Sequence, residues 1–239
     1  LEDIFEGYAP DYSSDRESDR DDIINQVSIN GNLKEAVSEF ASKADAYLEN
    51  VNRMESFEKL LDASGYYISF NYTHTLENVY NIPKKQVLHI HGEVGKNNLE
   101  LGFPEGDFKP EKYKYDVRQK GKGPYAKYDI DDYVNQIDDY YIATAYRGLI
   151  NKCKTFSKPI NVDLLIDFLD KNHVEVETII VYGHSCAIDF DYFIFLNKKY
   201  PNANWNFYVR GEKQERDVQK LVDKERIMNS YIYPVETMK

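Results

Sequence analysis

Apolar and polar positions alternate in blocks along this chain, and the blocks predict a helix followed by alternating strands and helices. Two apolar runs, YYISF over 66–70 and VLHIH over 87–91, read as strands separated by a short helix over 75–80. Apolar residues at helical spacing predict a packed helix from Leu33 to Val51, and a short strand is expected over 99–103. The first half of the chain thus has a strand, loop, helix, strand order.

The second half continues the alternation. Helices are predicted over 161–172, from Phe190 onward and over 214–222, and strands over 177–182, 205–209 and 231–235. The β-branched run at 177–182 lacks polar alternation, which is typical of a strand buried on both faces. Alternating strands and helices favour parallel pairing, so we expect an α/β fold with a doubly wound, mostly parallel, Rossmann-like sheet.

Composition divides the chain into three parts. Residues 1–31 read as the remnant of a helix followed by a charged connector, and the start at Leu1 without methionine suggests a missing amino-terminal segment. Residues 32–103 and 160–239 form the expected α/β domain. Residues 104–159, rich in tyrosine and lysine, read as a helical insertion, which either covers a ligand site or forms a packing subdomain with a solvated cationic face.

Net charge and cysteine content limit the possible binding partners and the cellular compartment. The net charge of -11 disfavours a broad nucleic-acid surface. Cys153 and Cys186 are too few for a disulfide framework, which favours a reducing cytoplasm. No apolar run approaches the roughly 18 residues of a membrane span, so no membrane association is expected. Assembly into a homo-oligomer stays open.

Polar residues follow three of the predicted strands. They are Asn71, Tyr72 and Thr73 after the first strand, His89, His91 and Gly92 at the end of the second, and Gly183, His184 and Ser185 after the strand at 177–182. Ligands of open α/β sheets bind beyond the carboxyl ends of the strands. We therefore expect Asn71 and His91 to face each other across one crevice. His91 should reach solvent, and His89 should hold a structural hydrogen bond.

Two other chemistries fit the same residues. His89, His91 and His184 could ligate a metal, but no carboxylate or thiolate stands at a convincing further position, so we expect none. The string Gly183 to Ala187 resembles a nucleophile elbow built on Ser185, yet a second glycine is missing. A phosphate or ribose loop at a helix N-terminus is the preferred interpretation, with Asp189 and Asp191 stabilising the first helical turn.

Four strings carry a family resemblance. FNYTHTLENVY, VLHIHGEVG, ELGF and VYGHSCAIDFDYF, in this order between 70 and 193, resemble the successive motifs of the AbiH family of bacterial abortive-infection proteins. The glycine-rich Gly-Asn-Gly-Phe-Asp type of stretch usual near the start of that family is not in this sequence. The resemblance implies a cytoplasmic protein of bacterial antiviral defence.

The AbiH pattern is more distantly similar to sirtuin-like NAD-consuming domains. That similarity implies that Asn71 orients the ribose and the attacking water, and that His91 is a general base toward a ribose hydroxyl. It also implies nucleotide contacts from Tyr72, Thr73, Gly92, Gly183, His184 and Ser185. Thr73 replaces an aspartate of the pattern and the sirtuin zinc module is missing, which argues against protein deacetylation.

The resulting hypothesis is an antiphage effector that binds NAD and hydrolyses its nicotinamide-ribose bond, acting as an NAD glycohydrolase once a phage-derived trigger is present. The alternative is a nucleotide-binding sensor that signals infection through a partner without turnover. A hydrolase with a Ser185 nucleophile and a purely structural α/β domain complete the set.

Overall fold

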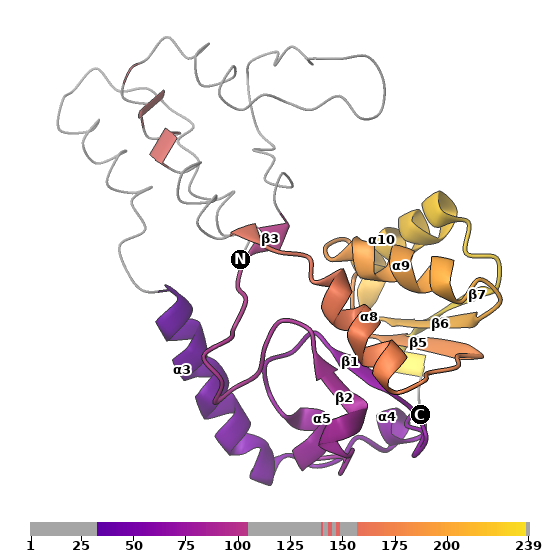
Figure 1. Ribbon diagram of the computed structural model, residues 1–239, viewed down its shortest axis with the longest axis horizontal. Coiled ribbons are helices and arrows are strands. Elements are labelled where there is room, and N and C mark those ends of the chain that lie inside the picture. Colours follow the sequence, from indigo (N-terminus) through magenta and orange to yellow (C-terminus); the bar gives the residue numbers. More distant parts are fainter. Residues whose placement is uncertain (1–32, 105–139, 141–142, 145–146, 149–156, 238–239) are drawn as a thin grey trace. The chain divides into compact units, whose positions relative to one another are not determined.

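The computed structural model describes residues 33–104, 140, 143–144, 147–148 and 157–237. The predicted connector over 1–31 and most of the predicted insertion over 104–159 lie outside the described residues. Residues 33–100 and 159–239 group into one compact unit, and residues 1–32 and 101–158 into another. The first of these units holds nearly all described elements (Figure 1).

The amino-terminal part of this unit is helical. Helix α3 spans Leu33–Ala46, the 3-10 helix η1 spans Tyr47–Asn50, and α4 is a single turn at Glu55–Glu58. Ala41 and Leu48, seven positions apart, are buried, whereas Phe40 is 73% exposed. The prediction that the whole apolar pattern packs inward is therefore wrong for Phe40, and also for the exposed Val51. Phe40 lies about 100° around the helix from its buried neighbour Ala41, and the tighter 3-10 turn after Ala46 shifts the side-chain phase before Val51.

The predicted strand, helix, strand order is confirmed, with shorter elements. Strand β1 spans Tyr67–Ser69, α5 spans Thr75–Asn78, η2 spans Lys84–Gln86 and β2 spans Val87–His89. Strands β1 and β2 pair in parallel, with Ser69 opposite His89.

The strand predicted over 99–103 is displaced toward the carboxyl end. Strand β3 is Phe103–Pro104, which pairs with β4 at Ser157–Lys158 in the other unit. Glu100 instead uses its backbone to hold the preceding loop: its N-H donates to the His91 carbonyl at 2.9 Å, and its own carbonyl accepts from the Tyr72 hydroxyl at 2.8 Å.

The carboxyl-terminal half follows the predicted alternation. Its elements are α8 (Val162–Lys171), β5 (Thr178–Tyr182), α9 (Phe190–Lys199), β6 (Asn204–Val209), α10 (Gly211–Glu225), β7 (Ser230–Pro234) and η3 (Val235–Thr237). The three strands lie in the order β5-β6-β7 and all pair in parallel, as predicted.

One face of this sheet carries the core. Trp205, Phe207 and Val209 alternate inward from β6 and are buried, together with side chains of α8, α9 and α10. These three helices lie over the sheet in Figure 1. Trp205 stacks on Phe207 with ring centroids 5.5 Å apart, so the central strand supplies the largest buried rings. Burial of such side chains is the main source of stability for this half.

The opposite face is more open in the described part of the chain. Ile180, Tyr231 and Tyr233 are exposed there, while Phe57 from α4 packs on Tyr182 with centroids 4.6 Å apart. The prediction that β5 is buried on both faces is therefore wrong.

The structure shows a mixed α/β architecture with short parallel sheets, and a doubly wound Rossmann-like arrangement with helices on both faces is not confirmed. None of the described helices combines the length and apolarity that crossing a membrane requires.

Candidate functional site

The chain segments that follow β1, β2 and β5 meet at Phe70. Phe70 comes one residue after β1, and its ring centroid lies 5.4 Å from that of His91 and 4.4 Å from that of His184. Phe193 from α9 stacks on the same ring at 5.9 Å. The three segments that follow these strands thus come together around one aromatic side chain.

Asp189 connects the two histidines of this cluster. Its Oδ2 lies 3.1 Å from His91 Nε2 and 4.0 Å from His184 Nε2, and the residue is only 4% exposed. Asp189 immediately precedes α9, with a positive φ of 61°, and makes no side-chain cap hydrogen bond. The expectation that Asp189 merely stabilises the first turn of this helix is wrong, although Asp191 does lie in that turn. We name Asp189, His91 and His184 the Asp189 cluster.

His91 is buried, with 4% of its surface exposed, so the expectation that it reaches solvent is wrong. The reason is local. Strand β2 ends at His89, and the chain turns at Gly92 with φ of 86°. A Cβ at this glycine would lie 2.2 Å from the carbonyl oxygen of Asn98, so only glycine lets the two backbone segments approach so closely. This turn directs His91 inward toward Asp189.

The three residues after β1 differ in their surroundings. Asn71 is exposed, and its carbonyl accepts hydrogen bonds from Ser69 Oγ at 3.2 Å and His89 Nδ1 at 3.0 Å. Thr73 Oγ1 lies 2.9 Å from Thr75 Oγ1. Burial, aided by the charges of Asp189 and Glu100, raises the pKa of Tyr72 to about 12, so its phenol stays protonated well above neutral pH.

The loop after β5 does not have the expected helix N-terminus. Gly183 has φ of 69°, Ser185 Oγ accepts from the Ala187 N-H at 3.3 Å, and α9 begins only at Phe190. Ser185 is therefore neither on a sharp strand-to-helix turn nor at a helix N-terminus, and that part of both interpretations is wrong. Burial raises the pKa of Cys186 to about 12, so this thiol is no nucleophile at neutral pH.

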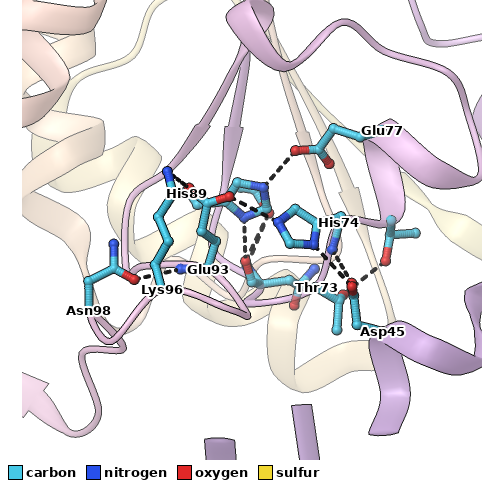
Figure 2. A network of polar contacts seen from close by, with 11 residues as sticks. Asp45, Thr73, His74, Glu77, His89, Glu93, Lys96 and Asn98 are labelled. Carbon is cyan, nitrogen blue, oxygen red and sulfur yellow. Dashed lines mark hydrogen bonds and ion pairs between the residues drawn. The ribbon is translucent and has the colours of Figure 1, made fainter. Parts of the chain in front are cut away.

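A second polar cluster surrounds His74 and His89, as Figure 2 shows. His74 lies between two carboxylates, with Nδ1 3.0 Å from Asp45 Oδ2 and Nε2 2.9 Å from Glu93 Oε2. His89 Nε2 lies 2.9 Å from Glu77 Oε1. The centroids of the His74 and His89 rings are 5.4 Å apart. The prediction that His89 holds a structural hydrogen bond is confirmed. We name Asp45, His74, Glu77, His89 and Glu93 the His74 cluster.

Charge dominates the His74 cluster. Burial lowers the pKa of His74, but hydrogen bonds to Asp45 and Glu93 outweigh burial and raise it above its usual value. His89 behaves alike: burial lowers its pKa, and the bonds to Glu77 and to the Asn71 carbonyl raise it further than burial lowers it. The carboxylates of this cluster therefore favour a positive charge beside them.

The role of Asp189 as a histidine partner was not predicted from the sequence. The same is true of the remaining members of the His74 cluster, which are His74, Glu77, Glu93 and Asp45. Two spacings were available as signals. His74 and Glu77 are three residues apart at a helical turn, and His89 and Glu93 flank the Gly92 turn. No spacing could have indicated Asp45, which reaches His74 from the end of α3.

This arrangement defines a class: an α/β protein with parallel strands whose carboxyl ends converge on histidines held by acidic side chains. The model of the family described as bacteriophage abortive infection AbiH matches residues 2–209. The chain belongs to the AbiH family, which confirms the resemblance carried by the sequence motifs, and it is thereby a bacteriophage abortive-infection protein. Comparison with curated proteins gave no match, and neither did comparison with solved structures.

Proposed function

We propose that this chain is an antiphage effector that binds NAD beside the Asp189 cluster and hydrolyses the nicotinamide-ribose bond. The observation that carries the proposal is the buried hydrogen bond of 3.1 Å between His91 Nε2 and Asp189 Oδ2. A histidine oriented by a carboxylate is a frequent form of general base. The bond lies where three strand ends meet, the position at which open α/β sheets bind ligands.

The proposed reaction needs few groups. The bond between nicotinamide and the ribose C1′ breaks, nicotinamide leaves with the bonding electrons, and water adds to C1′. The water proton passes to a base, so the products are nicotinamide, ADP-ribose and a proton. His91 serves as that base through the ribose hydroxyl, Asp189 keeps the imidazole oriented, and Asn71 orients water and ribose. Tyr72, Thr73, Gly92, Gly183, His184 and Ser185 are proposed as nucleotide contacts.

The second candidate function is a nucleotide-binding sensor that acts through a partner without turnover. It is favoured by the 4% exposure of both His91 and Asp189. A base so covered reacts only after the loops around it move, and a protein that moves these loops on binding can signal without chemistry. In the effector hypothesis the phage-derived trigger causes this opening.

His91→Ala is expected to abolish phage protection and to remove NAD loss during infection. General bases typically contribute about 100-fold or more to a rate, so turnover in this variant should fall at least about 100-fold. Asn71→Ala should have the same phenotype. The measurement is plaque counts together with extracted NAD and nicotinamide in infected cells. His173→Asn is the matched control, because His173 is exposed, belongs to neither cluster and has a positive φ of 48° that asparagine tolerates.

The same experiment separates the candidates. Loss of protection in His91→Ala with no NAD loss in the parent protein would replace the effector with the sensor. Full protection in both His91→Ala and Asn71→Ala would refute the whole site. Asp189→Asn tests positioning: it should lower kcat with little change in KM, because the carboxylate orients His91 without touching NAD.

A further inference from the structure

We propose that His74, His89 and Glu93 bind a divalent transition metal, with zinc as the reference ion. One ligand atom from each of these residues lies within 4.8 Å of the others. Tetrahedral zinc with bonds of about 2.0 to 2.1 Å places its ligand atoms about 3.3 Å apart. The 2.9 Å between His74 Nε2 and Glu93 Oε2 is near this value.

Hydrogen-bond partners at Nδ1 orient the rings of both histidines. Asp45 accepts from the backbone N-H of His74 at 2.6 Å and lies 3.0 Å from Nδ1 of the same residue, which fixes ring and backbone together. The Asn71 carbonyl can only accept, so His89 Nδ1 donates to it at 3.0 Å. Each neutral imidazole then carries its lone pair on Nε2. Partners of this kind behind a histidine are typical of metal sites, where they set the tautomer and the ring direction.

Two carboxylates lie beside the Nε2 atoms. Glu93 uses Oε1 for an ion pair of 2.6 Å with Lys96 and turns Oε2 toward His74, as Figure 2 shows. Glu77 places Oε1 beside His89 Nε2, and its Oε2 is buried with no hydrogen-bond partner among the described residues. The Glu77 side chain is only 6% exposed. A buried carboxylate is costly unless positive charge lies beside it, and an ion bound to His89 would supply such a charge next to Glu77.

The types of donor atom indicate the class of ion. Two imidazoles with one or two carboxylates suit zinc, iron, copper or nickel rather than magnesium or calcium. The side chains of His74 and Glu93 are 14% and 20% exposed, while that of His89 is 6% exposed, so the solvent-facing side of the site is at His74 and Glu93.

The test is titration of the tag-free full chain with zinc chloride by isothermal calorimetry, after treatment with a chelator. We expect one equivalent to bind and to raise the melting temperature, since a ligand that binds only the folded state stabilises it. His74→Asn and Glu93→Gln should weaken binding at least tenfold. Asp45→Asn keeps all three ligands and should weaken binding about 10- to 100-fold through orientation alone.

His173→Asn again serves as the matched control and should bind zinc like the parent. Circular dichroism of each variant establishes that the fold is retained. Absence of stoichiometric binding by the parent chain would overturn the proposal. Equal affinity in the parent, His74→Asn and Glu93→Gln would overturn it too, because the ion would then bind elsewhere. The outcome is independent of NAD cleavage, since the titration contains no nucleotide and none of the three ligands belongs to the proposed NAD site.

Discussion

Gly92→Ala is expected to lower the free energy of unfolding by about 2 to 6 kcal/mol, because it combines backbone strain with overpacking. Gly92 has φ of 86°, and an added Cβ would lie 2.2 Å from the oxygen and 2.8 Å from the carbon of the Asn98 carbonyl group. Backbone atoms cannot rotate away as a flexible side chain does, so the loop itself must move. Chemical denaturation followed by circular dichroism measures the loss.

The effect of Gly92→Ala should extend to function, because this residue lies between His91 and Glu93. A displaced loop carries one residue of each cluster with it. Gly95→Ala is the matched control: Gly95 has a similar φ of 82° but nothing within 4 Å of its added Cβ. It should lose only about 1 to 2 kcal/mol from the backbone conformation. Equal losses in the two variants would show that the contact with Asn98 is unimportant.

Trp205→Ala is expected to cost about 3 to 5 kcal/mol, the usual range for removing a large aromatic side chain from a core. Trp205 is 1% exposed, stacks on Phe207, and sits on the central strand opposite Ile179 on β5 and Ser230 on β7. The cavity left behind would open the middle of the three-stranded sheet. Thermal and urea denaturation should both report the loss.

Trp205→Phe should be far milder than Trp205→Ala. The Trp205 Nε1 donor is buried and has no hydrogen-bond partner among the described residues. Phenylalanine keeps most of the ring while removing this costly donor, whose burial penalty is about 1 to 3 kcal/mol. A loss in Trp205→Phe as large as in Trp205→Ala would mean that the indole N-H is bound within the fold after all.

Much of the fold could be predicted because its signals are local. The strings around Ile68 and Leu88 are short apolar runs bounded by polar residues, and the run at 178–182 leads directly into a glycine. Such runs identify strands, and alternation with helices identifies parallel pairing. The exposure of Phe40 and Ile180 was not predictable, because it depends on which face of their helix or strand the other elements cover.

For the two clusters, too, the local features could be predicted from the sequence, whereas the contacts between distant residues could not. His91 and His184 could be singled out as strand-end residues, and the structure brings both to Phe70. Their burial and their common carboxylate could not be foreseen, because Asp189 is 98 residues from His91 in the sequence. Likewise, Asp45 is 29 residues from His74, and only the folded chain joins them. Pairing across such separations leaves no periodic signal in a single sequence.

The segment His89-Ile90-His91 connects the two clusters through the backbone. His89 belongs to one cluster, His91 to the other, and Ile90 between them is 1% exposed and fixed in the core. The backbone N-H of Ile90 also donates a hydrogen bond to the Ser69 carbonyl at 3.0 Å. If the proposed ion binds His89 and the proposed nucleotide binds beside His91, both act on this one segment, and any change that one ligand makes in the affinity of the other is expected to be reciprocal.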